Sequence, residues 1–360
     1  MKILFIAPIP PPVTGHSLAS KYILEELNKK HEVLTVNLNK NSMSDGIDSI
    51  GRILEVLRIL LDVFKKKKGT ELIYLSISES IAGNLKDIFI YTICFFKLKN
   101  LYIHLHGGTI GKKLFEKYFI LRVINKFFLK RIGGAIVIGE SHKSIFKDMI
   151  SDEKIFNVPN FAEDFIFINK EEINKKFSNL EKIKVLFISN MIPGKGYIEL
   201  ADGFQLLSRE NQNKFELKFA GRFDSEKEKQ SFLNKIHNNS NIQYLGEVFG
   251  EDKKRVFHEA HVFFLPTGYL EGQPISILEA YASGCVVSVT EMGGIVDIYK
   301  NKLNGFTIRE KSANAIKDIF EELIAGSRSF ISIAKSNREI AESNYRKDNN
   351  LKMLIDILLH

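Results

Sequence analysis

Short apolar runs alternate with amphipathic stretches along most of the chain, and this alternation limits the possible folds more than any other feature. In the first half, stretches with helical spacing at 16–30, 49–67, 80–97 and 112–131 separate the apolar runs. Strands that alternate with helices form parallel sheets through βαβ units. The strands that we expect are Lys2–Ala7, Glu32–Val36, Glu71–Ser76, Leu101–Leu105, Ala135–Ile138, Ile183–Ser189, Phe215–Ala220, Ile242–Leu245, Val262–Leu265 and Val286–Val289.

The alternation is interrupted once, which predicts two domains. Residues 166–182 are polar and charged, lack a strong apolar pattern and are expected to form a linker. We therefore predict an α/β protein with two doubly wound, Rossmann-like domains, at 1–165 and 183–343, that face each other across a cleft. Ligands of open α/β sheets bind beyond the carboxyl ends of the strands, so we expect the chemistry in the loops there.

The composition excludes several classes of protein. With 44% hydrophobic and 26% charged residues among 360, the chain is typical of soluble globular proteins and not of disordered, collagen-like or coiled-coil ones. Its two cysteines are too few for a disulfide framework or a cysteine-rich zinc module. The longest apolar run, Ile88–Phe96, is too short to span a bilayer, and prolines after Ala7 break any signal-peptide pattern. We therefore expect a cytoplasmic location.

The positive charge is concentrated in the first half of the chain. The net charge is +8; residues 1–180 contain 27 basic and 19 acidic residues, whereas residues 181–360 contain 24 of each. Between residues 86 and 147, 12 basic residues face 3 acidic ones. This asymmetry indicates that one domain meets an anionic partner: a membrane surface, a nucleic acid or a phosphorylated substrate.

Two glutamates spaced eight residues apart, Glu271 and Glu279, form the strongest motif. Pro274 suits the first helical position, so we expect a helix from about Ile275 to Ala282. The free N–H groups of its first turn, near Gln273, form an anion site suited to a phosphate. A carboxylate beside that site can accept hydrogen bonds from sugar hydroxyls. The alternative is a helix whose acidic residues are surface charges.

A lysine between two glycines follows another expected strand. Lys195, in the segment Asn190–Gly196, can reach a diphosphate as a point charge. The alternative is a basic residue in an ordinary turn. Near the N-terminus, Gly15 allows close approach of the backbone to a ligand, and Thr14 or Ser17 can cap the following helix.

Two histidines end a strand in the first half. His104 and His106 lie on one face because side chains alternate along a strand. They could supply two ligands to a metal ion, although no cluster of carboxylates or cysteines accompanies them. We prefer a structural His104 and a functional His106.

Several motifs of other protein classes are absent or incomplete. Residues 107–113 resemble a P-loop, but the first glycine is one position too close and Lys113 stands where serine or threonine should bind magnesium. No Gly-x-Gly-x-x-Gly follows Ala7, which argues against a dinucleotide-dependent oxidoreductase. No Asp-x-Asp occurs, so we expect neither a metal site nor a cofactor.

Together and in order, these motifs resemble the retaining glycosyltransferases of family 4, which have the GT-B fold. The resemblance covers nearly the whole chain and is densest at 185–204, 263–285 and 290–306, with smaller pieces at 104–108 and 157–161. It implies that the second domain binds a nucleoside-diphosphate sugar. It also implies that a C-terminal helix, within 344–360, crosses back onto the first domain.

The resemblance assigns roles to the motif residues on the donor side. Lys195 would clamp the diphosphate, Glu271 would contact donor-sugar hydroxyls, and Glu279 would bind the ribose. The backbone at Gln273 and Ile275, on either side of Pro274, would hold the β-phosphate.

Residues of the first domain would complete the site. His106 would touch the donor sugar, and the Gly15 loop would approach the phosphates and the acceptor, with His16 and Gly107 on the acceptor side. The resemblance also implies retention at the anomeric carbon. We favour a same-face attack in which the leaving phosphate takes the acceptor proton, without a covalent nucleophile.

The chain departs from the family pattern at a few positions. The family usually has Gly-Arg where this chain has Ser189-Asn190, and Arg222, after another strand, is a candidate to replace the missing charge. His16 stands where a second glycine is common and could narrow the acceptor side. Asp297 replaces the commoner glutamate.

The basic first half implies a lipid-linked acceptor. Residues 57–69 and 112–134 mix apolar and cationic residues, which indicates contacts with an anionic membrane. We therefore expect a peripheral enzyme of surface polysaccharide or O-antigen synthesis, a hexosyl- or N-acetylhexosaminyltransferase that extends a lipid-linked oligosaccharide at the inner membrane face. One alternative is an enzyme of the same fold with a soluble acceptor. Another is a basic binding protein for nucleic acid, which we disfavour because the phenylalanines near the lysines have the helical spacing of a core.

Overall fold

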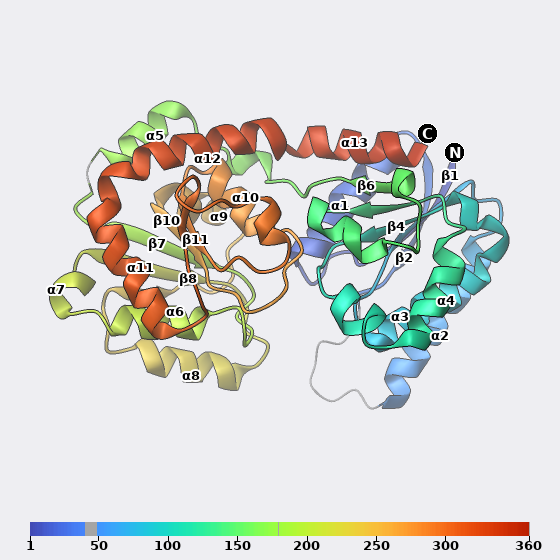
Figure 1. The fold of residues 1–360 in the computed structure, drawn as a ribbon, viewed down its shortest axis with the longest axis horizontal. Helices are drawn as coiled ribbons and strands as arrows, with labels where there is room; N and C mark the ends of the chain where they lie inside the picture. The colour runs from blue at the N-terminus through green and yellow to red at the C-terminus, as the bar shows by residue number, and fades with distance from the viewer. Residues whose placement is uncertain (40–48, 179, 360) are drawn as a thin grey trace. The chain divides into compact units, whose positions relative to one another are not determined.

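The computed structural model describes residues 1–39, 49–178 and 180–359, which form two compact units (Figure 1). Of these described residues, the first unit comprises those within 1–159, 271–273 and 348–359, and the second comprises those within 160–270 and 274–347. Each unit has a six-stranded parallel sheet surrounded by helices and a hydrophobic core of its own. The prediction of two doubly wound α/β domains is therefore confirmed.

The first unit is built on a sheet with the strand order β2-β1-β3-β4-β5-β6. Its strands are β1 (Lys2–Ala7), β2 (Glu32–Asn37), β3 (Leu72–Ser76), β4 (Leu101–Leu105), β5 (Gly134–Val137) and β6 (Ile155–Asn157). Its helices are α1 (Gly15–Asn28), α2 (Ser49–Lys66), α3 (Ile81–Ile93), the 3-10 helix η1 (Phe95–Asn100), the π-helix η2 (Gly111–Phe115), α4 (Phe119–Leu129), the 3-10 helices η3 (Glu140–Phe146) and η4 (Asp152–Lys154), and α13 (Lys347–Leu359). β3 and β5 are buried along their whole length, as expected of a parallel sheet covered on both faces.

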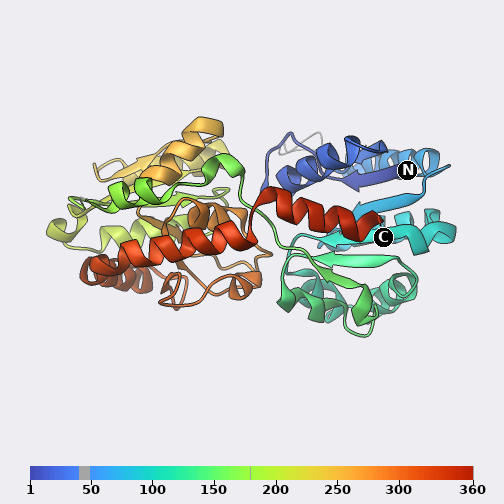
Figure 2. The ribbon, with the colours of Figure 1, turned by 90° about the horizontal axis from the view of Figure 1, so that it is seen from above.

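The helices of the first unit fall into two groups because crossovers between parallel strands are right-handed. The chain steps from β1 to β2 in one direction and then returns toward β6 in the other, so α1 lies on one face and α2, α3 and α4 lie on the opposite face (Figure 1). α3 packs against both α2 and α4. The last helix, α13, runs along the same unit, where it lies against β4 and β6 (Figure 2).

The second unit is built on a sheet with the strand order β12-β11-β10-β7-β8-β9. Its strands are β7 (Ile183–Ile188), β8 (Phe215–Ala220), β9 (Ile242–Tyr244), β10 (Val262–Leu265), β11 (Val286–Val289) and β12 (Gly305–Thr307). Its helices are η5 (Asp164–Ile166), α5 (Lys170–Phe177), α6 (Tyr197–Gln205), α7 (Arg209–Gln212), α8 (Glu226–Ile236), α9 (Gly250–Glu259), α10 (Ile275–Ala282), η6 (Gly294–Asp297), α11 (Ala313–Gly326), η7 (Ser327–Ser329) and α12 (Phe330–Asn344).

The expected linker at 166–182 is instead part of the second unit. It contains α5, which Asn169 caps by accepting a hydrogen bond from the backbone of Glu172. Ile173 and Phe177, four residues apart, are buried in the second core. Two apolar positions in a charged stretch are enough to anchor a two-turn helix, although they make a weak pattern.

Other differences from the expected elements are short. β6 and β12, each of three residues, were not predicted because three residues show no period. Residues 313–359 contain the helices α11, α12 and α13, with the short η7 between the first two. Within the described ranges, no helix has the length and apolar character needed to cross a membrane.

Candidate functional site

In the second unit, the candidate donor-binding loops follow three neighbouring strands. The loops that contain Lys195, Arg222 and Pro274 come after β7, β8 and β10, which lie side by side in the sheet. Since the strands are parallel, the carboxyl ends of all three meet at one edge. This is the edge at which ligands of open α/β sheets bind.

The Lys195 turn depends on both of its glycines. Gly194 and Gly196 have φ angles of +92° and +87°, a left-handed conformation that other residues rarely adopt. A Cβ on Gly196 would lie 2.1 Å from the backbone oxygen of Pro266. The Lys195 ammonium lies 5.7 Å from the centre of the Tyr269 ring, and the Tyr269 hydroxyl donates a hydrogen bond to the Pro193 oxygen. Tyr269 therefore ties this turn to the loop after β10.

The structure brings the backbones of Asn190 and Arg222 close together. The N–H of Met191 donates to the carbonyl of Arg222 over 2.8 Å, and Met191 pairs with Phe223 as in a parallel sheet. Gly221 makes this approach possible, because a Cβ there would lie 1.8 Å from the Ser189 oxygen. Arg222 therefore follows β8 beside Asn190.

Helix α10 begins at Ile275 and ends at Ala282, as predicted. Pro274 precedes it as the capping residue, with φ −62° and ψ 118°, so the expectation that Pro274 is the first helical residue is wrong by one position. The N–H groups of Ile275 and Ser276 have no acceptor within the helix, as in any first turn. Glu271, half-buried, and Gln273, buried, are grouped with the first unit.

Glu279 lies inside the second unit and forms an ion pair that the sequence did not indicate. Its carboxylate is 2.5 Å from the ammonium of Lys253, which is also 2.9 Å from the carboxylate of Glu163. Burial raises the pKa of Glu279 although Lys253 opposes this shift. The two carboxylates together raise the pKa of Lys253. We refer to Glu163, Lys253 and Glu279 as the buried ion triad.

In the first unit, three imidazole rings form a stack at the carboxyl ends of the strands. The His106 ring lies between those of His16 and His104, at centroid distances of 4.2 and 3.9 Å. His16 Nε2 lies 2.5 Å from Ser76 Oγ, and His104 Nδ1 lies 2.6 Å from the Tyr74 hydroxyl. Both ring nitrogens of His106 are buried without a hydrogen-bond partner in the part of the chain that the structure describes.

Burial keeps the three imidazoles neutral. It lowers the pKa of His16 to about 4, assisted by the charge of Lys86, and that of His104 to about 3. It lowers the pKa of His106 well below the usual range. Neutral rings can stack without charge repulsion. Among the described residues, no group of three histidine, cysteine, aspartate or glutamate side chains is arranged to hold a metal ion.

The chain has relatives among known proteins. Residues 169–347 match the family of glycosyl transferases group 1.

This chain contains a group 1 glycosyltransferase domain.

Relatives of the chain are also named as sugar transferases. The chain is 23% identical over 198 residues to the amylovoran biosynthesis glycosyltransferase AmsK of Erwinia amylovora, which covers 53% of this chain and 48% of the relative. It is 24% identical over 227 residues to the N,N'-diacetylbacillosaminyl-diphospho-undecaprenol alpha-1,3-N-acetylgalactosaminyltransferase of Campylobacter jejuni, covering 61% and 58%. It is 23% identical over 288 residues to the capsular polysaccharide biosynthesis glycosyltransferase CapH of Staphylococcus aureus, covering 76% and 77%. The chain thus spans about half to three fifths of the length of the first two.

Solved structures share the whole fold. HepE of Anabaena, in complex with UDP, matches with a TM-score of 0.71 and 17% identity, over 99% of both chains. The structure of WaaG, a glycosyltransferase involved in lipopolysaccharide biosynthesis, matches with a TM-score of 0.70 and 13% identity over 99% of both chains. The chain therefore has the GT-B fold, and the predicted fold class is confirmed.

The predicted site residues fall in both units of the chain. Asn190, Lys195, Arg222, Pro274, Ile275 and Glu279 lie in the second unit, whereas Gly15, His16, His106, Gly107, Glu271 and Gln273 lie in the first. Thr14, and not Ser17, caps α1, and Gly15 is the first residue of that helix. The roles of these residues stay predictions.

Sequence reasoning missed Glu79 in the first unit. Its carboxylate accepts hydrogen bonds from the N–H groups of Thr109 and Ile110, at 2.5 and 3.0 Å. A Cβ on Gly107 would lie 1.7 Å from the same carboxylate. The P-loop-like segment therefore already holds an anion of the chain itself, which explains the glycine at 107. Glu79 follows β3 and precedes the cap of α3, a position at the carboxyl edge of the sheet that could have identified it.

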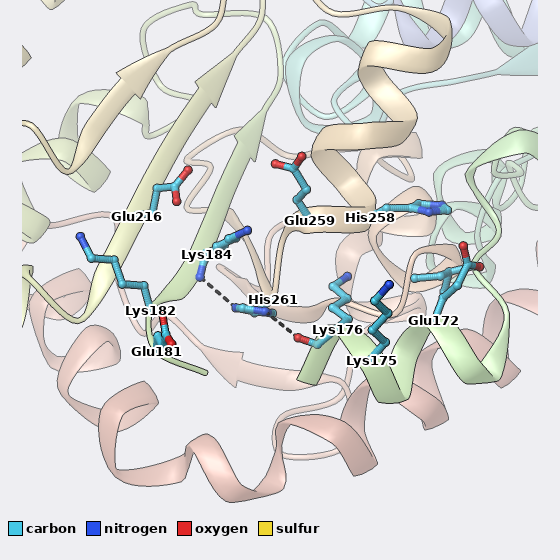
Figure 3. A pocket seen from close by; sticks show the side chains of 11 residues that line it. Glu172, Lys175, Lys176, Glu181, Lys182, Lys184, Glu216, His258, Glu259 and His261 are labelled. Atoms are coloured by element: carbon cyan, nitrogen blue, oxygen red, sulfur yellow. Dashed lines mark hydrogen bonds between the residues drawn. The ribbon is translucent and has the colours of Figure 1, made fainter. Parts of the chain in front are cut away.

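The group 1 domain also contains a cavity of about 610 Å³ at the opposite edge of its sheet (Figure 3). Its lining includes four lysines and four glutamates, which come from α5, the end of α9 and the starts of β7 and β8. His261 accepts a hydrogen bond from the N–H of Lys184 and bonds to the Lys176 carbonyl, both over 3.0 Å (Figure 3). Burial lowers the pKa of His261 to about 4. Because the lysines and glutamates balance each other and His261 is bonded to its neighbours, we interpret this group of side chains as structural.

Proposed function

We propose that this chain is a retaining glycosyltransferase of polysaccharide biosynthesis. It moves a sugar from a nucleoside-diphosphate sugar to a lipid-linked oligosaccharide at the cytoplasmic face of the membrane. The observation that carries the proposal is the gathering of Lys195, Arg222 and the start of α10 at one edge of the sheet in a group 1 domain. HepE, which shares the fold, was crystallised with UDP and with UDP-glucose.

The donor side suits a departing polyanion. When the bond between the anomeric carbon and the phosphate breaks, negative charge develops on the nucleoside diphosphate. Lys195 and Arg222 would supply positive charge, and the N–H groups at the start of α10 would supply hydrogen bonds and a helix dipole. Asn190, beside Arg222, would add hydrogen bonds. Since the sequence has no Asp-x-Asp, we propose that these groups work without a metal ion or cofactor.

Two side chains would hold the transferred sugar, and a third would hold the ribose of the nucleotide. Glu271 would accept hydrogen bonds from sugar hydroxyls, and the unpaired nitrogens of His106 would bond to the donor sugar. Glu279 would bind ribose hydroxyls with a carboxylate that Lys253 fixes in place. The acceptor hydroxyl would attack from the face that the diphosphate leaves. One bond to the anomeric carbon breaks, one forms, and the acceptor proton passes to the leaving phosphate.

The acceptor is proposed from chemistry and from the relatives. The name of the Campylobacter jejuni relative describes transfer to a diphospho-undecaprenol-linked sugar, and that of CapH describes capsular polysaccharide biosynthesis. A lipid diphosphate is an anion that suits the basic first unit. Gly15, His16 and Gly107 lie at the carboxyl ends of the strands in the first unit, which is the proposed acceptor side.

The proposal is tested with a panel of nucleoside-diphosphate hexoses and N-acetylhexosamines, in the presence of a chelator and of extracted lipid-linked oligosaccharide. We expect one donor to release its nucleoside diphosphate with the chelator present, and NMR of the product to show a retained anomeric configuration. Glu271→Gln should abolish the release, whereas Glu216→Gln, a control in another half-buried glutamate, should not. Inversion, dependence on a metal, or release unaffected by Glu271→Gln would contradict the mechanism. Equal rates with soluble sugars would favour the soluble-acceptor alternative.

A further inference from the structure

The exposed apolar side chains of the protein are concentrated on four adjoining elements of the first unit. Among the described residues, 23 large hydrophobic side chains are exposed, and 14 of them lie on α2, α3, η1 and α4. Six are phenylalanines: Phe64, Phe89, Phe95, Phe96, Phe119 and Phe127. We call the exposed side of these four elements the apolar face.

The apolar face is continuous. α3 packs between α2 and α4, and Figure 1 shows the three helices on the same side of the first sheet. The Lys67 ammonium at the end of α2 donates a hydrogen bond to the Ile93 carbonyl at the end of α3. The Phe95 ring of η1 stacks on Phe127 of α4 at 6.3 Å.

Each helix carries its exposed apolar residues at helical spacing. On α3 they are Ile81, Leu85 and Phe89, one every four residues. On α4, Phe119, Val123 and Phe127 have the same spacing. Such stripes normally pack against another element, yet in the described structure these point outward.

The face is also large for a monomeric protein. Since a full aromatic side chain presents about 150–250 Å², the six phenylalanines, exposed by 39–95%, alone present roughly 700 Å². Monomers rarely expose contiguous apolar patches of more than a few hundred Å², and larger ones mark interaction sites.

The segment that carries the face is rich in positive charge. Residues 51–131 contain 16 lysines and arginines against 6 acidic residues, a net charge of +10 in a chain of net charge +8. The Arg131 guanidinium lies 4.1 Å from the centre of the Phe127 ring, and the Lys67 ammonium lies 5.2 Å from that of Phe64. Long cationic side chains beside apolar surface are typical of membrane interfaces.

We infer that the apolar face inserts into the surface of an anionic lipid bilayer. A second copy of the chain would place two strongly positive faces against each other, which like-charge repulsion opposes. Eight of the 14 side chains are aliphatic and offer nothing to a nucleic acid. An anionic bilayer complements both the charge and the apolar surface.

This orientation would serve the proposed function, on which this step alone rests. α3 begins just after the loop of Glu79, and η2 and α4 follow the loop of Gly107. The chain therefore runs directly from the proposed acceptor side into the apolar face. A bilayer on that face would present the head of a membrane-anchored acceptor near those loops.

The test uses the absence of tryptophan from the chain. Phe96→Trp and Phe119→Trp each place a single fluorophore at side chains that are 95% and 77% exposed, so the fold should tolerate them. Leu206→Trp, at a side chain 51% exposed in the second unit, is the matched control. With vesicles of phosphatidylglycerol and phosphatidylcholine in equal parts, we expect a blue shift at 96 and 119 and none at 206. Vesicles of phosphatidylcholine alone should give a much weaker shift.

Sedimentation with the same vesicles measures how much the apolar and the cationic side chains each contribute to membrane binding. Phe96→Ser with Phe119→Ser should lower the partition coefficient about tenfold or more, since burial of one aromatic side chain is worth at least that factor. Lys112→Gln with Lys113→Gln should lower it about 25-fold, at about fivefold per charge. Leu206→Ser with Leu303→Ser should leave it unchanged.

Three results would overturn the inference. They are the absence of vesicle binding, binding without a blue shift at 96 and 119, and self-association or nucleic-acid binding that buries these positions instead. Nucleotide-sugar turnover is measured separately. Vesicle binding without turnover would refute the proposed function but support the insertion of the apolar face into a bilayer. Turnover without vesicle binding would support the proposed function but refute that insertion.

Discussion

Removal of the positive charge of Lys253 should destabilise the second unit by several kcal/mol. The side chains of Lys253, Glu163 and Glu279 are only 13%, 11% and 3% exposed. Lys253→Met would leave two carboxylates buried beside each other without a counter-charge. Breaking a buried pair in this way costs about 3–5 kcal/mol. In a domain of this size, 1 kcal/mol shifts the melting temperature by about 2–4 °C, so we expect a decrease of about 6–20 °C.

The loss should depend on pH. Burial raises the pKa of Glu279 even in the presence of Lys253. A carboxyl whose pKa is raised by folding stabilises the fold when the pH lies below the pKa in the unfolded chain. This stabilisation is lost as the pH rises through the pKa in the folded protein. Without Lys253 the shift becomes larger, because the protonated carboxyl is then the better buried form. The destabilisation by Lys253→Met should therefore be greatest at neutral pH and decrease on acidification.

Scanning calorimetry at neutral and mildly acidic pH measures this effect. Lys254→Met is the matched control, since its ammonium is 3.9 Å from the exposed Glu251 carboxylate, and such surface pairs are worth about 0–1 kcal/mol. Adding Glu279→Gln to Lys253→Met should restore part of the stability by removing one of the stranded charges. A loss in Lys253→Met no larger than that in Lys254→Met, or a loss that does not change with pH, would refute the reasoning.

Two further predictions concern the other site groups. The first unit should lose stability as the pH falls from about 6.5 to about 4, because His16 and His104 bind protons in the unfolded chain but stay neutral when buried in the fold. Urea denaturation across this range measures the loss, and His16→Gln should make the stability less dependent on pH. A urea midpoint that does not change with pH would contradict the prediction. Tyr269→Ala should weaken nucleoside-diphosphate binding about two- to fivefold, the worth of an exposed cation–π contact with Lys195, whereas Tyr269→Phe should retain most of the affinity. Titration calorimetry measures both, and equal losses in the two variants would show that the ring contact is unimportant.

The sequence predicted the elements that are buried on both sides. β1, β10 and β11, and the helix α10, begin and end at the predicted residues. In a parallel sheet covered by helices, a strand is a short unbroken apolar run, and its limits are visible as changes of polarity. The motif residues of the second unit were then placed correctly at the carboxyl ends of β7, β8 and β10, because parallel strands put those ends at one edge.

The partners of the site residues could not be predicted in the same way. A period tells which side of an element is buried, but not which distant side chain lies against it. Lys253 meets Glu163, 90 residues away, and Glu79 meets the loop of Gly107. Each contact joins two elements that the fold brings together, so only the structure reveals that Glu279 is paired and that the glycine loop is filled.

The same argument explains the outcome for the phenylalanines near the lysines, whose helical spacing was interpreted as that of a core. Phe115 and Phe128 do lie in the core, whereas Phe64, Phe119 and Phe127 are exposed. A helix on a sheet buries one stripe, and in α2 that stripe includes Val63. The next residue, Phe64, points to the other side and is 60% exposed. A helix that is apolar on both sides satisfies the spacing of a core helix and still leaves one side without a partner inside the fold. Apolar periodicity therefore identifies a surface that avoids water, and only the fold decides whether the chain itself or a surrounding bilayer covers it.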